Sequence, residues 1–166
     1  MNKLISIMDR ALSIFCISLS SFLVVCVVWQ VFSRYVLNAP STMTDEVARF
    51  LFIWVALMGA AYTLGQKRHL AIDLLDFKLE QKPRMRCKLH MLINVISFSF
   101  ASVILSYGGG RLMLKTLSTG QVSPALGIEM GLVYAAIPLS GIFMILYLIN
   151  DFKLNLAQLK TLPNSL

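Results

Sequence analysis

Three charged side chains stand together in the stretch NAPSTMTDEVARFLFIW, directly before an apolar run. Asp45, Glu46 and Arg49 fall within five positions, and Arg49 follows Asp45 by four residues and Glu46 by three. In a helix these separations bring the three side chains onto one face, where carboxylates and a guanidinium can pair. The cluster is therefore either an ordinary helix start or a functional site.

Few other residues have the types and spacing that catalysis or metal binding requires. His69 and Asp73 are four residues apart, but two such residues do not complete a metal site. Cys16, Cys26 and Cys87 form no C-x-x-C pair, which argues against a membrane thiol oxidoreductase. The sequence also has no Ser/His/Asp arrangement, no phosphate-binding glycine loop and no pair of in-span histidines for haem. We therefore expect that this chain is not an enzyme and holds no cofactor.

Long apolar runs must position the charged cluster. The chain has 166 residues, 57% of them hydrophobic and 14% charged, and its mean hydropathy is +0.74. It contains four uncharged runs of 17 to 23 residues, and about 20 residues cross the hydrocarbon core of a bilayer. We expect an all-α integral membrane protein whose single domain covers 1–166. The predicted transmembrane helices lie at about 11–33, 47–66, 89–112 and 130–150.

The distribution of Lys and Arg predicts the orientation of these spans. The N-terminus, the segment between the second and third spans, and the C-terminal tail hold 11 of the 15 Lys and Arg residues. The other side holds four: Arg34, Arg49, Arg111 and Lys115. Because positive residues accumulate in cytoplasmic loops, we expect both termini in the cytoplasm and the charged cluster outside. The net charge of +7 reflects this bias, and we expect no nucleic-acid partner.

The segment between the second and third spans has the pattern of an amphipathic helix. Its polar positions recur at spacings of four, three and four, at His69, Asp73, Asp76 and Glu80. We expect a helix at about 69–80 in the cytoplasmic membrane interface, on lipid or against a partner. The alternative is a continuation of the second helix. Phospholipid headgroups are the expected contacts of the basic residues that follow, Arg84, Arg86 and Lys88.

Small residues and turn formers mark the outer ends of the spans. Thr42 or Thr44 could cap the second helix. The run Gly108–Gly110 predicts close packing or a kink near the outer end of the third span. Gly127 and Gly131 form a G-x-x-x-G pair, and Pro138 should kink or loosen the fourth helix. Spacing alone leaves open whether the small residues pack within the chain or against another subunit.

Three stretches resemble the small, Q-type membrane subunit of the tripartite ATP-independent periplasmic (TRAP) transporters. The first resembles the family's turn, paired acids and aromatic-rich helix, at Arg34, Asp45, Glu46, Arg49, Trp54 and Gly59. The second is similar to its His-x-x-x-Asp segment, at His69 and Asp73. The third matches its fourth-helix signature, at Pro124, Ala125, Leu126, Gly127, Tyr134 and Pro138. Met43 departs from the pattern, because many members carry Trp before the threonine and paired acids.

The resemblance implies a scaffold subunit in the bacterial inner membrane, with both termini cytoplasmic. It implies two protein partners, a large membrane subunit that holds the sodium and substrate sites and a periplasmic binding protein that delivers an organic acid. Overall similarity favours the sialic-acid branch over the dicarboxylate branch. The expected contacts with these partners are Arg34, Asp45, Glu46, Arg49, Trp54, Gly127, Gly131 and Tyr134. Arg111 and Lys115 are further outer-face candidates, for which snorkelling to the membrane interface is an equal alternative.

Two interpretations of the outer charges remain open at this point. Asp45, Glu46 and Arg49 could form a structural pairing network, which we favour, or could contact the binding protein directly. For the whole chain, the alternative function is a small self-associating four-helix multidrug exporter. Such exporters use a membrane-embedded carboxylate in the first helix, and the first predicted span has none.

Overall fold

The computed structural model describes residues 2–66 and 83–161. Within these ranges the regular structure is helical, with one isolated antiparallel bridge between Val122 and Glu129. Four helical stretches are long and apolar enough to cross a membrane, Ile5–Tyr35, Thr42–Gly65, Leu89–Ser118 and Met130–Ala157. The predicted all-α, four-span architecture is confirmed, and the chain is a multi-pass membrane protein.

The helices run further than the uncharged runs that predicted them. Helix α1 covers Asn2–Tyr35 and α2 covers Thr42–Gly65. The third span is built from α4 (Pro83–Phe100), a π-helix η1 (Ala101–Gly108) and α5 (Gly109–Ser118). The fourth comprises α6 (Met130–Tyr134) and α7 (Ala136–Thr161). Charged residues do not end these helices, because a helix that leaves the hydrocarbon can continue into the interface.

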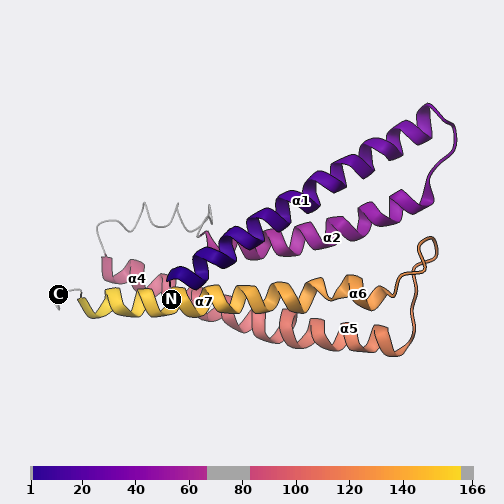
Figure 1. Ribbon diagram of the computed structural model, residues 1–166. Coiled ribbons are helices and arrows are strands. Elements are labelled where there is room, and N and C mark those ends of the chain that lie inside the picture. The colour runs from indigo at the N-terminus through magenta and orange to yellow at the C-terminus, as the bar shows by residue number, and fades with distance from the viewer. Residues whose placement is uncertain (1, 67–82, 162–166) are drawn as a thin grey trace.

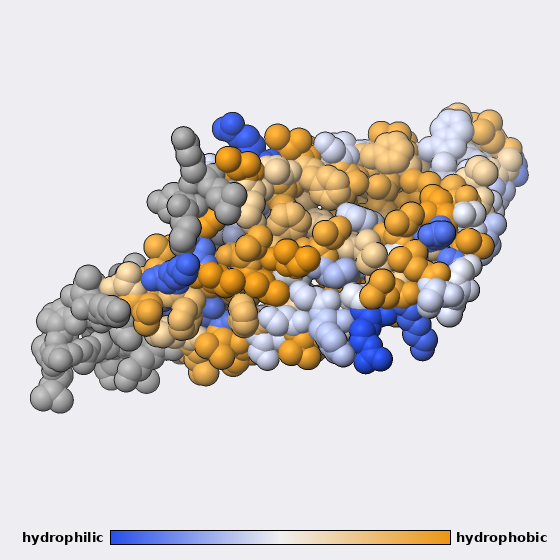
Figure 2. Space-filling view, turned by 60° about the horizontal axis from the view of Figure 1, so that its bottom comes forward, coloured by the Kyte–Doolittle hydropathy of each residue, from blue (hydrophilic) through white to orange (hydrophobic). Residues whose placement is uncertain are grey.

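The four spans form two antiparallel pairs. Figure 1 shows α1 and α2 as one hairpin and α4–η1–α5 lying along α6–α7 as the second pair. We call the end that carries the 36–41 and 119–129 connections the outer end, following the predicted orientation. The pairs lie together toward the other end, the inner end, and diverge toward the outer end (Figure 1). Hydrophobic side chains cover much of the visible face in Figure 2, as expected for a surface that meets lipid or apolar protein.

Two small clusters form the core, the first between the two pairs and the second mainly within the second pair. Leu12, Ala61 and Tyr147 bring together α1, α2 and α7, and a second cluster joins the third and fourth spans around Leu105 and Leu148. Small residues permit this approach. An added Cβ on Gly109 would lie 2.5 Å from Ile137 Cγ2, so the α5–α7 crossing needs a glycine there. The predicted close packing near the outer end of the third span therefore occurs within the chain.

The third and fourth spans each contain one irregularity, a π-helical segment in the third and a break in the fourth. The fourth helix is interrupted at Ala135, three residues before Pro138. Pro138 has no backbone N–H to donate to the carbonyl of Tyr134, so the predicted loosening is confirmed at this place. In the third span the π-helical segment Ala101–Gly108 ends on the first residue of the glycine run. Wider π turns of this kind interrupt otherwise α-helical segments.

Two polar contacts join helices across the molecule. The Tyr147 hydroxyl of α7 donates to Asp9 Oδ1 of α1 at 2.6 Å. Asn94 of α4 is buried, and its Nδ2 donates to the Leu148 carbonyl of α7 at 3.2 Å. Both contacts satisfy polar groups that would otherwise be costly in an apolar environment.

Candidate outer-end site

The connection between α1 and α2 is a tight, hydrogen-bonded turn. The Val36 N–H donates to the Phe32 carbonyl at 2.8 Å, and the Ala39 N–H donates to the Ser33 carbonyl at 3.1 Å. Asn38 sits at φ 50°, a left-handed conformation that Asn tolerates better than most residues. These bonds fix where α2 starts relative to the end of α1.

Ser41 caps α2, and the predicted caps Thr42 and Thr44 are wrong. Ser41 has extended backbone angles, and the Thr44 N–H donates to its Oγ at 3.5 Å. The Thr44 hydroxyl turns back to the Ser41 carbonyl at 3.1 Å. Gln30 of α1 then reaches across, and its Nε2 donates to the Thr44 carbonyl at 2.8 Å. The first turn of α2 is therefore held both by its own cap and by α1.

Asp45 and Arg49 form the predicted ion pair. Arg49 Nη2 lies 2.9 Å from Asp45 Oδ2, with the two side chains 68% and 53% exposed. A solvent-exposed pair at this spacing contributes only about 0.3–0.5 kcal/mol. This pair therefore contributes little to the position of α2.

Glu46 does not join that pair, so the predicted three-membered network is wrong. Its Oε2 instead accepts hydrogen bonds from the Ser123 hydroxyl, the Ala125 N–H at 3.0 Å and the Leu126 N–H at 3.1 Å. One carboxylate oxygen thus joins α2 to a segment about 80 residues later in the chain. Two successive backbone N–H groups and a hydroxyl form a concave donor site that suits an anion.

The segment that holds Glu46 is a small hairpin, which we call the outer turn (121–130). The Ser123 N–H donates to the Ile128 carbonyl at 2.9 Å, and the Met130 N–H donates to the Gln121 carbonyl at 2.9 Å. Gly127 closes the turn at φ +66°, where a residue with a side chain would be strained. Ser123 is only 2% exposed, so its hydroxyl needs the carboxylate partner.

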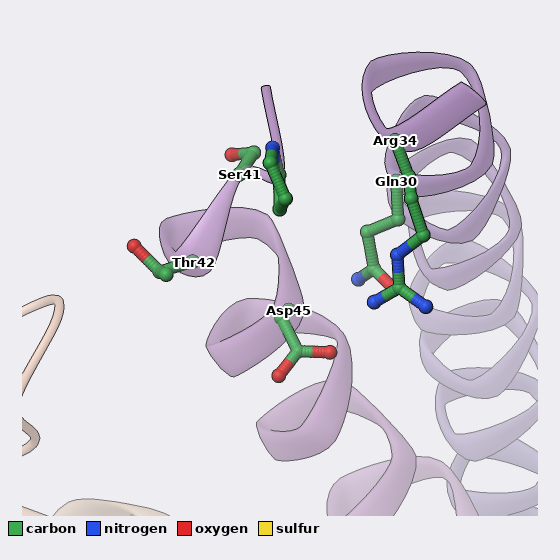
Figure 3. Close-up of a pocket in the computed structure, with 6 residues that line it drawn as sticks. Gln30, Arg34, Ser41, Thr42 and Asp45 are labelled. Carbon is green, nitrogen blue, oxygen red and sulfur yellow. The ribbon is translucent and has the colours of Figure 1, made fainter. Parts of the chain in front are cut away.

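A recess of about 140 Å³ opens beside this arrangement, between the ends of α1 and α2. Its lining residues are Gln30, Arg34, Pro40, Ser41, Thr42 and Asp45. In Figure 3 Arg34 and Gln30 extend from α1 into the space opposite Asp45. Arg34 is exposed and has no ion-pair partner within the described residues. The recess therefore presents one unpaired guanidinium, two hydroxyl groups, the Gln30 amide and the Asp45 carboxylate, which pairs with Arg49.

Comparison with known proteins identifies the family of this chain. Residues 23–158 match the family profile described as "Tripartite ATP-independent periplasmic transporters, DctQ component". The chain belongs to the DctQ family. This family is a membrane component of TRAP transporters and not a group of enzymes.

Individual relatives agree with this assignment. The DctQ-family chain is 29% identical over 146 residues to the "Sialic acid TRAP transporter small permease protein SiaQ" of Vibrio cholerae, covering 87% of this chain and 81% of that protein. It is 30% identical over 100 residues to the "C4-dicarboxylate TRAP transporter small permease protein DctQ" of Rhodobacter capsulatus, covering 60% and 43%. It is also 23% identical over 128 residues to the "Sialic acid TRAP transporter permease protein SiaT" of Haemophilus influenzae, covering 76% of this chain and 20% of SiaT.

The other predicted contact residues of this DctQ-family chain do not take part in the hydrogen bonds to Glu46. The Trp54 ring packs edge-on against Phe15 of α1, with ring centroids 6.1 Å apart. Tyr134 is half-buried at the end of α6. Gly131 is buried in α6, and an added Cβ would lie 2.4 Å from Leu117 Cγ. Because Gly127 lies in the outer turn, Gly127 and Gly131 do not share a helix face.

Part of the predicted site falls outside the described chain. The amphipathic segment 69–80, with His69, Asp73, Asp76 and Glu80, lies outside the described residues. Arg84, Arg86 and Lys88 belong to the first turns of α4, but their side chains lie outside the described part. Within residues 2–66 and 83–161, no group of three His, Cys, Asp or Glu residues is placed to hold a metal ion.

Proposed function

We propose that this chain is a non-catalytic scaffold subunit of a sodium-coupled, binding-protein-dependent secondary transporter that imports an organic acid. In this proposal the large membrane subunit holds the substrate and sodium sites, and the present chain braces it. The chain lies in the bacterial inner membrane with both termini in the cytoplasm. The match of residues 23–158 to the DctQ component supports the assignment to a transporter subunit.

The observation that carries the bracing role is the Glu46 contact with the outer turn. It joins the two helix pairs where Figure 1 shows them diverging. A scaffold must present a fixed surface to its partners, and a charge-assisted contact to backbone N–H groups fixes a turn better than neutral contacts do. Glu46 therefore has a structural role, in which it shapes the outer end for other proteins.

Arg34 is the best candidate for direct contact with a binding protein. Its guanidinium is exposed, unpaired within the described residues, and opens onto the recess between α1 and α2. An acidic side chain on a docking protein would find a charged donor there. Asp45 and Arg49, which are exposed beside it, belong to the same docking surface. Trp54 and Tyr134 are proposed to pack against the large subunit, whereas Gly131 serves packing within the chain.

Similarity to these relatives does not distinguish between the candidate substrates. Identity to the sialic-acid and C4-dicarboxylate small permeases is 29% and 30%. We propose sialic acid or another carboxylate. Selectivity then lies in the partner proteins, because the chain offers no enclosed anion site within the described residues.

Reconstituted uptake tests this proposal. The chain, its large subunit and its binding protein are placed in liposomes with and without an inward sodium gradient, and uptake of sialic acid and C4-dicarboxylates is measured. Uptake should require all three proteins and the gradient. Arg34→Glu should raise the binding-protein concentration needed for half-maximal uptake while leaving the large subunit bound. Arg10→Glu, an exposed charge reversal at the inner end, is the matched control.

The exporter alternative predicts a different result. If the chain alone forms a homodimer and moves cations across liposomes, the scaffold proposal is wrong. If uptake needs the three proteins but Arg34→Glu leaves the binding-protein dependence unchanged, the docking role of Arg34 is wrong and the scaffold role stands.

A further inference from the structure

A second charged surface lies on the third span, away from the outer-end site. Tyr107, Arg111 and Lys115 are exposed and follow one another at intervals of four residues, which places them along one side of η1 and α5. We call these three residues the cationic stripe. The Arg111 guanidinium carbon lies 5.9 Å from the centroid of the Tyr107 ring. This stacking stabilises the Arg111 side chain in a defined position.

The cationic stripe faces away from the rest of the chain. Gly109 is buried against Ile137 and Pro138 of the fourth span, and Thr116 is also buried. At 100° per residue, Arg111 and Lys115 lie about 200° and 240° around the helix from Gly109. The stripe is therefore directed toward whatever surrounds the bundle.

The level of the stripe matches a membrane interface. The uncharged run 89–110 ends directly before Arg111. Its 22 residues span about 33 Å of helix, close to the roughly 30 Å of hydrocarbon in a bilayer. Lys115 then lies about 6 Å further out, at the headgroup level. Tyr107, one turn below Arg111, has the place of an interfacial aromatic residue.

The charges of the stripe lack counter-ions in the part of the chain that the structure describes. Neither Arg111 nor Lys115 has an ion-pair partner within the described residues. Exposed apolar side chains lie below them on the same side of the helix, at Phe100 and Ile104. In Figure 2, which brings the α5 side forward, strongly hydrophilic atoms gather at the lower edge beside hydrophobic surface. An apolar surface ending in two cations complements a lipid tail that ends in a phosphate.

We infer that the cationic stripe binds the headgroup of an anionic phospholipid in the leaflet at the outer end. Arg111 and Lys115 bracket the phosphate, the Arg111 guanidinium donating two parallel hydrogen bonds and Lys115 acting as a point charge. Phe100 and Ile104 lie along the acyl chains. The outer-end site on α1 and α2 takes no part in this binding.

Native mass spectrometry of the full chain tests the inference. The protein in detergent is titrated with phosphatidylglycerol and, separately, with phosphatidylcholine, and the retained lipid is measured. Each cation near a lipid headgroup is expected to contribute about five-fold to binding. The double substitution Arg111→Gln with Lys115→Gln should therefore weaken phosphatidylglycerol binding about 25-fold. It should weaken phosphatidylcholine binding less, because the choline cation offsets the charge of the phosphate that both lipids carry. Arg111→Lys keeps the charge and should retain most of the binding.

Arg49→Gln is the matched control, because it also removes one outer cation, but from a residue already paired with Asp45. It should leave lipid binding unchanged. Equal phosphatidylglycerol binding by the wild type and the double variant would overturn the inference, as would an equal loss in Arg49→Gln. If the double variant keeps its lipid but no longer co-purifies with the large subunit, the stripe is a protein interface and the lipid site is refuted.

Discussion

Replacement of Glu46 by alanine should release the outer turn from α2. The substitution removes the acceptor of three hydrogen bonds, from the Ser123 hydroxyl and from the N–H groups of Ala125 and Leu126. Hydrogen bonds to a charged group contribute about 1.5–3 kcal/mol each. Water at the membrane surface can replace some of the lost hydrogen bonds, so we count only two of the three, each at about 1.5 kcal/mol. The expected loss is about 3 kcal/mol in the local free energy of opening.

Hydrogen–deuterium exchange of the full chain in lipid nanodiscs measures this loss. A change of 3 kcal/mol corresponds to about a 100-fold increase in the exchange rate of the released amides. The effect should be larger at Ala125 than at Leu126, because the Leu126 N–H keeps Ser123 Oγ at 3.2 Å as a second acceptor. Amides in the middle of α7 should exchange as in the wild type.

Asp45→Ala is the matched control, since it removes the neighbouring carboxylate of the same helix turn. The Asp45–Arg49 pair is exposed and contributes about 0.5 kcal/mol or less, so exchange in the outer turn should rise less than about three-fold. Glu46→Gln keeps an oxygen acceptor without its charge and should fall between the two. Wild-type exchange at Ala125 in the Glu46→Ala protein would refute the assignment of Glu46 as the residue that holds the turn.

Three further substitutions test packing and polar contacts elsewhere. Gly131→Ala places a Cβ 2.4 Å from Leu117 Cγ, so the α5–α6 contact must shift, and we expect a loss of about 1–3 kcal/mol in thermal or denaturant unfolding in detergent. Tyr147→Phe removes the hydroxyl that donates to Asp9, which should cost about 1–2 kcal/mol in the same assay. Gly127→Ala forces a side chain to φ +66° and should cost about 1 kcal/mol, seen as faster exchange confined to the outer turn.

Matched controls separate these effects from general damage. Gly110→Ala adds the same methyl group where no heavy atom outside its chain neighbours and its own helix backbone lies within 4 Å. It should leave stability unchanged or raise it by up to about 1 kcal/mol, because alanine loses less backbone entropy in a helix. Tyr35→Phe removes a hydroxyl from a side chain that is 75% exposed and should likewise be neutral. If Gly131→Ala and Gly110→Ala unfold alike, the close approach at Gly131 is not limiting. If Tyr147→Phe is as stable as the wild type, the Asp9 contact does not contribute.

The four spans could be predicted because bilayer thickness acts on each segment separately. A run such as 89–110 must be helical if it crosses hydrocarbon, whatever its neighbours are. The Asp45–Arg49 pair could also be predicted from local sequence, because residues four apart on a helix lie side by side. The interruption near Pro138 also follows from local chemistry, because proline lacks the required N–H.

The partner of Glu46 could not be predicted from local spacing. Its donors lie in a turn about 80 residues away. Two of them are backbone N–H groups, which every residue except proline has, so no residue type identifies them. Pro124 after Ser123 favours a turn at this place, but nothing local indicates that the Ser123 hydroxyl meets α2. The sequence also could not show that Ser41 is the residue that caps α2. The stretch Ser41–Thr42–Met43–Thr44 offers three hydroxyls, and the turn after α1 decides which one is placed first.

Two polar ties between the helix pairs, both among the residues that the structure describes, lie toward opposite ends of the molecule. Glu46 connects α2 to the outer turn, while Asp9 and Tyr147 connect α1 to α7. A hinge requires one end that is free to open, and in this chain each end is closed by a bond to a carboxylate. Rotation of one pair against the other must break a charge-assisted hydrogen bond at one end or the other. The chain is therefore expected to move as a single rigid body.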